Sequence, residues 1–336
     1  MESPKLYAPR RGKTSPMRRA RRRLRTLRLL VPASTSNVGP GFDALGIALD
    51  LRLSVTWTPA ARTRLQRRGA LAESSLPARG DPLLRGLRRA AALARARLPA
   101  GDIIVDAPFP PGRGLGASGA AIAAGLLLGN RLTGNRLSRQ ALLDAAIRLE
   151  GHPENAVAAF LGGAHWSAPG TDGRWIHQPV PLHRDLRFLL VIPPYPLSTE
   201  RARKALPATV PFQRAAAQAR RGPILLEGLR TLDRDRIRAG LQDDLHVAAR
   251  LGLLPGAAQL LDDATRAGAL GATVSGAGSA LLVLTRSRDL PRLEARLWPR
   301  VQRVWGGDGG VLAARPGKPL SGSAGGTPAA GARRGR

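Results

Sequence analysis

The chain has 336 residues, no cysteine, 43% hydrophobic residues and a formal charge of +30. Without cysteine neither a disulfide scaffold nor a thiolate metal site can form, so a bound metal must be held by oxygen or imidazole. The apolar fraction is too high for a wholly disordered chain, and the length fits two domains or one large one. No stretch approaches the roughly 18 consecutive apolar residues of a membrane helix, which predicts no membrane partner.

The first half of the chain is expected to begin with strands around a Gly/Pro loop. Residues 27–31 predict a strand, 32–43 the loop, and 45–57 one or two further strands with alternating apolar residues. Residues 58–81 are polar and rich in turn residues, and no motif can be read in them. The next expected elements are a helix at 82–98, a strand at 102–106, a glycine-rich loop opening a helix to about 131, and a helix at 137–149 with Ser138 as N-cap.

The second half starts near Gly170, after a Gly/Pro/Asp turn. Its expected elements are a strand at 188–192, a loop at 198–204, helices at 211–220, 224–231, 233–249 and 256–268, strands at 272–275 and 280–284, a helix at 289–298 and a strand at 310–314. Strands and helices alternate without the rhythm of a parallel doubly wound sheet. This order predicts an α+β protein of two domains.

The ends of the chain are expected to lie outside the folded body. Eleven Lys/Arg and a single acidic residue lie within 1–28, and five more cations lie within 315–336, so the ends hold about half of the excess charge. Only four cations of the whole chain are lysine, which we interpret as compositional bias rather than as a nucleic-acid surface. We expect a basic disordered extension at 1–26, an N-terminal domain at 27–168, a C-terminal domain at 169–314 and a disordered tail at 315–336.

A glycine-rich loop between a strand and an Ala-rich helix is the most informative segment. Its glycines would let the backbone approach an anion, and the helix N-terminus would point free N–H groups toward it. Ser118 could either cap the helix or place its hydroxyl on a phosphate-bound Mg²⁺. No Lys-Ser/Thr follows the glycines, so the loop is not a Walker A motif.

This loop resembles the phosphate loop of the superfamily of galactokinase, homoserine kinase, mevalonate kinase and phosphomevalonate kinase, Pro-x-x-x-Gly-Leu-Gly-Ser-Ser-Ala. Ala117 replaces the first serine and Gly119 the alanine, whereas Ser118 keeps the second serine, which reaches the metal and phosphates in the family. The resemblance implies that ATP phosphates bind along Pro110, Pro111, Gly112, Arg113, Gly114, Leu115, Gly116, Ala117, Ser118, Gly119 and Ala120.

The segment 32–46, Pro-Ala-Ser-Thr-Ser-Asn-Val-Gly-Pro-Gly-Phe-Asp-Ala-Leu-Gly, is similar to the first motif of homoserine kinases. The resemblance implies that Asn37 and Asp43 bind an amino-acid substrate carrying an ammonium and a hydroxyl. Taken alone, the two side chains could equally cap two turns.

The segment 149–163 resembles the homoserine kinase run Glu-Gly-His-Pro-Asp-Asn. The resemblance implies that Glu150 is the second Mg²⁺ ligand beside Ser118, an oxygen pair that suits a hard cation, and that His152 lines the substrate site. Asn155 stands where mevalonate kinases have a carboxylate base, so the implied chemistry lacks a strong protein base. Glu154 in place of Asp is a mild departure.

Three further matches lie in the second half. Segments 198–207 and 243–256 resemble family stretches that nominate Thr199, Arg203 and Arg250 for substrate binding, since a guanidinium can hold a carboxylate by two hydrogen bonds. The turn at 275–278 resembles the third superfamily motif, whose N–H groups would close over the phosphate and substrate; Ser279 stands where proline is usual.

Together the matches imply a two-domain kinase that uses ATP and Mg²⁺ to phosphorylate the side-chain hydroxyl of L-homoserine in the cytoplasm, on the route to threonine. The implied fold is a ribosomal-protein-S5-like domain followed by a ferredoxin-like domain, and a homodimer is left open. The alternatives are another kinase of the superfamily, such as one acting on mevalonate, a degenerate inactive kinase, or a basic RNA-binding protein on an S5-like scaffold. The aromatic content of only 4% offers RNA no stacking platform, so nucleic acid is the less favoured partner.

Overall fold

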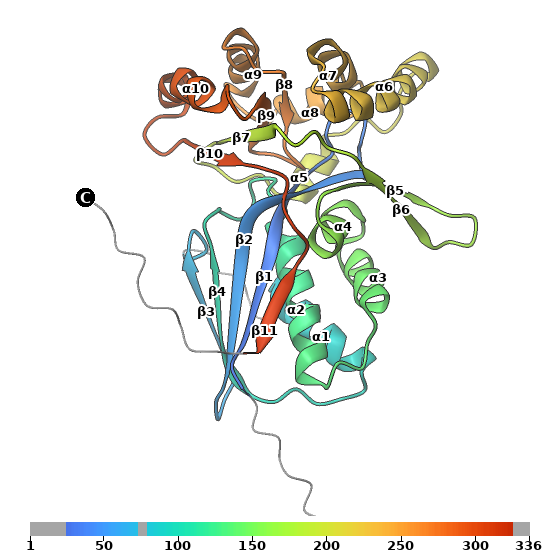
Figure 1. Cartoon of the computed structure of the whole chain (residues 1–336), viewed down its shortest axis with the longest axis vertical. Helices are drawn as coiled ribbons and strands as arrows, with labels where there is room; N and C mark the ends of the chain where they lie inside the picture. The colour runs from blue at the N-terminus through green and yellow to red at the C-terminus, as the bar shows by residue number, and fades with distance from the viewer. Residues whose placement is uncertain (1–24, 73–78, 325–336) are drawn as a thin grey trace, which may run out of the picture.

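The computed structural model describes residues 25–72 and 79–324, which form two α+β halves stacked on each other (Figure 1). Each half is a β-sheet with helices packed on it, so the α+β fold class predicted from the sequence is confirmed. Within these residues no helix combines the length and the apolar character that crossing a bilayer requires.

The first sheet holds seven of the strands. They are β1 (Leu27–Ser36), β2 (Leu45–Pro59), β3 (Arg64–Gly69), β4 (Gly101–Ala107), β5 (Ala164–Pro169), β6 (Trp175–Val180) and β11 (Ser321–Ala324). The strand order is β11-β1-β2-β4-β3, with the β5–β6 hairpin on β2. Of the strand pairs formed by residues 25–72 and 79–324 in this sheet, β3–β4 is parallel and the others are antiparallel. β2 alternates buried Leu53, Val55 and Trp57 with half-buried neighbours, so this part of the strand has one face on the core.

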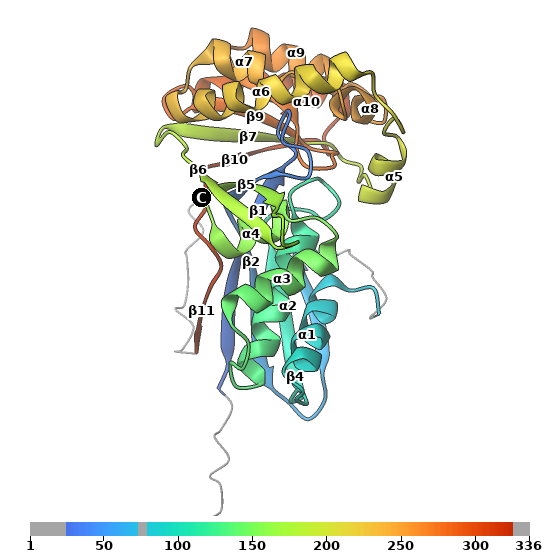
Figure 2. The ribbon, with the colours of Figure 1, turned by 90° about the vertical axis from the view of Figure 1, so that its right-hand side faces the viewer.

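Four helices cover the inner face of this sheet (Figure 2): α1 (Pro82–Leu93), α2 (Ala117–Leu132), α3 (Arg139–Glu150) and α4 (Glu154–Leu161). α1 and α2 approach closely because glycines meet at the crossing. A Cβ on Gly125 would lie 2.0 Å from the Leu83 carbonyl oxygen, and one on Gly86 would lie 2.3 Å from that of Ile122. Ser138 caps α3 by accepting a hydrogen bond from the Ala141 N–H at 3.1 Å, as predicted.

The second half is an antiparallel four-stranded sheet of order β10-β7-β9-β8 covered by helices. Its strands are β7 (Leu186–Ile192), β8 (Gly271–Val274), β9 (Leu281–Arg286) and β10 (Gly310–Ala314). Its helices are α5 (Thr199–Lys204), α6 (Phe212–Thr231), α7 (Arg234–Leu241), α8 (Val247–Leu251), α9 (Ala257–Arg266) and α10 (Leu290–Trp305).

The structure differs from the predicted domain limits at two places. The boundary predicted at 168/169 cuts the β5–β6 hairpin, although both strands belong to the first sheet. The tail predicted to be disordered from 315 returns to the first half, where β11 pairs with β1 and Arg315 forms an ion pair with Asp50. Main-chain pairing, which composition does not reveal, orders this Gly/Ser-rich segment. The parts of the expected disordered ends at 1–24 and 325–336 lie outside the described residues.

Several element predictions also differ in detail. β3 lies in the stretch read as polar and turn-rich, and α5 occupies the expected loop at 198–204. α6 runs through Pro223 as one helix, whereas the single helix expected at 233–249 is divided into α7 and α8. A short turn separates the two helices, and its last residue, the buried His246, is the N-cap of α8.

Candidate active site

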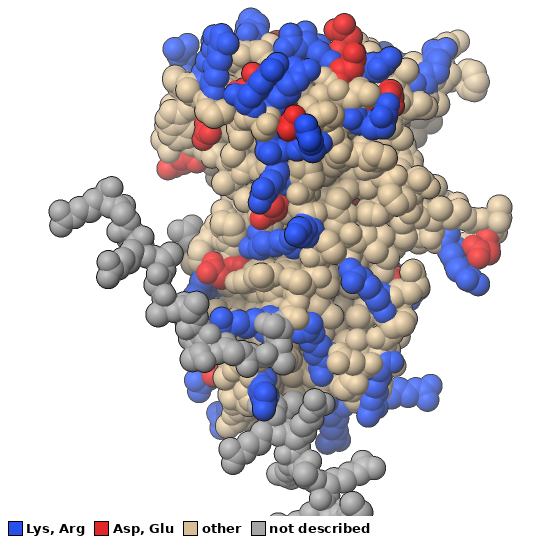
Figure 3. Space-filling model, viewed as in Figure 1, with Lys and Arg blue, Asp and Glu red and all other residues tan. Residues whose placement is uncertain are grey.

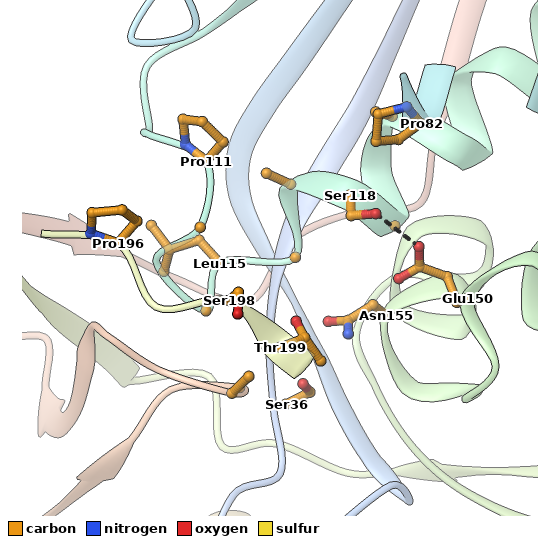
Figure 4. Close-up of a pocket in the computed structure, with 18 of the residues that line it drawn as sticks. Ser36, Pro82, Pro111, Leu115, Ser118, Glu150, Asn155, Pro196, Ser198 and Thr199 are labelled. Atoms are coloured by element: carbon orange, nitrogen blue, oxygen red, sulfur yellow. Dashed lines mark hydrogen bonds between the residues drawn. The ribbon is translucent and has the colours of Figure 1, made fainter. Parts of the chain in front are cut away.

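A cavity of about 620 Å³ lies where the two halves meet. Its walls come from the loop before α2, the α3–α4 connection, α5 and the turn between β8 and β9 (Figure 4). The site therefore depends on how the second half sits against the first.

The glycine-rich loop opens into the N-terminus of α2. Gly112, Gly114 and Gly116 have φ of +68°, +68° and +64°, a left-handed conformation that glycine adopts without strain. A Cβ on Gly114 would lie only 1.9 Å from the Ser275 carbonyl oxygen, so the second half clamps the loop at this point. Among the described residues no side chain caps the α2 N-terminus, and Ala117, Ser118 and Gly119 of its first turn line the cavity. This arrangement suits an anion such as a nucleotide phosphate.

Ser118 and Glu150 meet at one wall of the cavity. The Ser118 hydroxyl donates to Glu150 Oε1 at 3.0 Å (Figure 4). Burial raises the pKa of Glu150, although the charge of His152 and the hydrogen bond from Ser118 oppose that shift. Within 25–72 and 79–324 no group of three His, Cys, Asp or Glu could enclose a metal ion. Two oxygen ligands fit Mg²⁺, which keeps several waters and takes further oxygens from phosphates.

The start of α4 carries a small polar cluster. His152 Nδ1 lies 2.9 Å from Glu154 Oε1, and Glu154 is 1% exposed. Burial opposes protonation of His152, but the hydrogen bond and charge of Glu154, with the charge of Glu150, outweigh it and raise the pKa of the imidazole. Asn155 Oδ1 accepts from the Ser34 hydroxyl at 2.8 Å, and its Nδ2 donates to Glu154 at 3.2 Å. Glu154, read from the sequence only as a mild departure, is thus part of the cavity wall.

The loop after β1 brings Asn37 and Asp43 together. Both have left-handed φ, +56° and +50°, and Asn37 Oδ1 accepts from the Asp43 N–H at 2.8 Å, so the amide closes the loop. Arg203 of α5 donates two hydrogen bonds of 3.0 and 2.6 Å to the Asp43 carboxylate. The hydrogen bonding and the negative charge of Asp43 raise the pKa of Arg203. Asn37 and Arg203 line the cavity, whereas Asp43 is not among its lining residues in the described part of the chain.

Arg250 reaches the cavity from α8 and is almost fully buried, at 1% exposure. Its Nη1 donates to the Gly276 carbonyl oxygen at 2.7 Å. Burial, followed by the charge of Arg203, lowers the pKa of Arg250 to about 10, so it stays charged at neutral pH. Thr199, the first residue of α5, lines the cavity beside Ser198 (Figure 4).

Some predicted contact residues lie elsewhere. Four of them, Asp43, Pro110, Arg113 and Ala120, are not among the residues that line the cavity in the described chain. The Arg113 guanidinium donates to the carbonyl oxygens of Pro193 and Pro194 at 3.0 and 2.7 Å, so it fastens the loop to the second half.

The backbone N–H groups of the glycine turn between β8 and β9 bind carbonyl oxygens of the protein, whereas the sequence predicts that they close over the ligand. The N–H groups of Ser275, Gly276 and Gly278 donate to the carbonyl oxygens of Ala280, Ser36 and Ser275, respectively. The turn still lines the cavity through 276–278, and its Gly276–Ser36 bond of 2.9 Å joins the two halves.

Part of the cavity wall is formed by residues of β3, β4 and the start of α1 that the sequence does not predict as site residues. Arg67 of β3 forms an ion pair of 2.5 Å with Asp81, which also caps α1 by accepting from the Leu84 N–H at 2.9 Å. Leu71 and Val105 add an apolar wall. Asp81 followed by proline is a helix N-cap pattern, so the sequence indicates the start of α1 at this point. It does not indicate that Asp81 lies beside Arg67.

The fold and the cavity together define the class of protein as a small-molecule kinase: the cavity combines the N-terminus of α2, the Ser118–Glu150 oxygen pair and the arginines 203 and 250. Profiles of the GHMP kinase N-terminal and C-terminal domains match residues 84–163 and 225–301. The homoserine kinase of Prochlorococcus marinus (strain NATL2A) is 36% identical over 276 residues, covering 80% of this chain and 87% of that protein. The chain belongs to the homoserine kinase family of the GHMP kinases.

Solved structures agree with this assignment at the level of the fold. The crystal structure of homoserine kinase from Cytophaga hutchinsonii has a TM-score of 0.76 at 22% identity and covers 95% of this chain and 100% of that one. The L. major mevalonate kinase solved with R-mevalonate has a TM-score of 0.65 at 16% identity, covering 86% and 95%. Because kinases named for different substrates share the fold, the substrate must be argued from the site.

Proposed function

We propose that this enzyme transfers the γ-phosphoryl group of ATP to the side-chain hydroxyl of L-homoserine, giving O-phospho-L-homoserine for threonine biosynthesis. The observation that carries the proposal is the pair Arg203 and Arg250, which line the same cavity as the α2 N-terminus. Paired guanidiniums next to a phosphate site suit a small substrate with a carboxylate at one end and a hydroxyl at the other.

Homoserine would be held at both charged groups of its amino-acid end. Arg250 and Arg203 would bind the carboxylate. Asp43 does not itself line the cavity and both of its oxygens accept from Arg203, so it would bind the ammonium through the lone pairs that Arg203 leaves free. Asn37, His152 and Thr199 line the same cavity and would surround the substrate side chain. Replacing an arginine should therefore raise KM for homoserine far more than KM for ATP.

ATP would bind along the loop and α2, with its phosphates at residues 112–119 and its base toward Arg67 and Leu71. Ser118 and Glu150 would hold Mg²⁺, which when bound neutralises charge on the phosphates. Glu150→Ala or Ser118→Ala should reduce activity, and full activity in either variant would contradict the metal assignment.

The chain positions the reactants rather than supplying a strong base. Asn155 is an amide held by Ser34 and Glu154, and the resemblance implies that it stands where mevalonate kinases have a carboxylate base. Phosphoryl transfer passes through a loose transition state, so alignment and charge neutralisation can supply most of the rate. The Ser34–Asn155–Glu154 bonds fix the amide for this purpose.

The alternative substrates are less well supported. Mevalonate has no ammonium group to pair with Asp43, and its kinases carry a carboxylate where this chain has Asn155. On the face that Figure 3 shows, Lys and Arg lie over both halves with acidic residues among them, so this face does not single out an RNA-binding surface.

Two further properties follow as proposals from this assignment. The enzyme would act in the cytoplasm, where ATP and amino-acid precursors are available, and it could work as a homodimer. Light scattering of the purified full chain would give the oligomeric state directly.

The substrate assignment is tested by ADP release from Mg-ATP with L-homoserine, L-serine and mevalonate compared at equal concentrations. We expect L-homoserine to give the highest kcat/KM. Preference for mevalonate would contradict the proposal.

A further inference from the structure

We propose that His246 is a positioning residue that fixes Arg250 so that its Nε–Nη2 edge receives the substrate carboxylate. The inference rests on the proposed function, because it concerns how the same enzyme recognises its amino-acid substrate. It adds a residue for which the sequence motifs gave no role.

His246 and Arg250 lie one helical turn apart. His246 is the N-cap residue of α8, Arg250 belongs to that helix, and both are 1% exposed. His246 Nδ1 lies 3.0 Å from Arg250 Nη1, and His246 Nε2 lies 3.0 Å from the Gly39 carbonyl oxygen. The imidazole is therefore placed between the arginine and the loop of the first half that also carries Asn37.

These two contacts determine where the imidazole proton lies. A guanidinium only donates hydrogen bonds and a carbonyl oxygen only accepts them. Nδ1 must therefore be the acceptor for Arg250, and Nε2–H must donate to Gly39. His246 is a neutral imidazole of one defined tautomer, which would fail in this role if it were protonated.

Burial is the main reason that His246 stays neutral. Asp243 Oδ2 lies 3.4 Å from Nε2, but the other Asp243 oxygen accepts the backbone N–H groups of residues 245, 246 and 247. Burial lowers the pKa of His246 to about 4, and the positive charge of Arg250 acts in the same direction. The negative charges of Asp243 and Asp43 favour protonation but do not outweigh burial. At neutral pH the acceptor lone pair on Nδ1 is therefore available to the arginine.

The protein contacts occupy one side of the guanidinium and leave another free. Both hydrogens of Arg250 Nη1 have acceptors, the Gly276 carbonyl oxygen at 2.7 Å and His246 Nδ1. Nε is buried and has no hydrogen-bond partner in the described part of the chain, and no bond from Nη2 is found there either. Because a buried donor without a partner is costly, the Nε–Nη2 edge is the side prepared for a carboxylate.

Phe42 supports the same geometry from the side. Its ring centroid lies 5.2 Å from that of His246, 5.3 Å from Arg250 Cζ and 5.5 Å from Arg203 Cζ. One aromatic ring thus contacts both carboxylate-binding arginines and the histidine that orients one of them. Movement of His246 would shift Arg250 relative to Arg203.

Two substitutions of His246 separate its two contacts. In His246→Asn the amide oxygen can take the place of Nδ1 and accept from Arg250. In His246→Gln the amide nitrogen can take the place of Nε2 and donate to Gly39, but the acceptor for Arg250 is lost. We expect His246→Gln to raise KM for L-homoserine on the order of ten- to a hundredfold and to leave KM for ATP within about twofold, while His246→Asn stays near wild type.

A double-mutant cycle with Arg250→Lys tests whether His246 acts through the arginine. We expect His246→Gln to add no further increase in KM for homoserine in the Arg250→Lys background. Equal effects of the Gln and Asn variants, additive effects in the cycle, or parallel rises in both KM values would overturn the inference. If His246→Gln does not fold, as shown by thermal unfolding, His246→Asn and His246→Ala give the same comparison. A wild-type chain inactive on homoserine would refute the proposed function itself.

Discussion

Substituting Gly114 by alanine tests whether the junction between the halves positions the phosphate loop. The added Cβ would lie 1.9 Å from the Ser275 carbonyl oxygen, whereas ordinary contacts begin near 3.4 Å, so loop and turn must separate by about 1.5 Å. A displacement of about 1 Å at an active site can reduce the rate on the order of a hundredfold. We therefore expect kcat/KM for homoserine to fall by about two orders of magnitude.

Gly173→Ala is the matched control for this experiment. Gly173 has a similar left-handed φ of +75°, but a Cβ there would meet nothing within 4 Å. Both variants lose about 1 kcal/mol of stability from the backbone conformation, and only Gly114→Ala also displaces a neighbour. Urea unfolding and steady-state kinetics measure the two effects. Equal stability and equal kcat/KM in the two variants would refute the reasoning.

Three further predictions concern the metal site, the buried histidine and the C-terminal strand. Glu150→Gln should raise the Mg²⁺ concentration needed for half-maximal rate by at least about tenfold, measured by Mg²⁺ titration at saturating ATP. The folded pKa of His246 is about 4 against an ordinary 6.5, so the unfolded chain binds the proton more readily and stability falls as pH decreases from 6.5 to 4. His246→Asn should lose about 3 kcal/mol less than wild type between pH 7 and 4 in urea unfolding, and identical profiles would contradict this. Ending the chain after Ala314 removes β11 and the Arg315–Asp50 ion pair, and should lower the unfolding temperature by several degrees; an unchanged value would contradict a stabilising role for β11.

The sequence predicted those parts of the site whose residues belong to short motifs. The loop, the first turn of α2 and the Ser118–Glu150 pair follow from a glycine pattern and from motifs, each contained within about fifteen residues. The roles of the individual site residues stay predictions, but the structure brings Asn37, Arg203 and Arg250 to one cavity.

The parts that could not be predicted depend on pairing between distant segments. β3 was missed because its strand pattern is weak and its stability comes from parallel pairing with β4, more than thirty residues later. β11 was missed because its Gly/Ser composition suggests disorder until β1 offers it an edge. His246 is an ordinary residue in the sequence, and its role appears only when Gly39, two hundred residues away, lies at its Nε2.

The most direct measurement of the central claim is ³¹P NMR of the product formed by the full chain from Mg-ATP and L-homoserine. We predict a phosphomonoester on the homoserine side-chain hydroxyl, formed together with ADP and absent from the Arg250→Lys, Arg203→Lys double variant under the same conditions. ADP formed with free phosphate only, or no turnover at all by the folded wild-type chain, would contradict it.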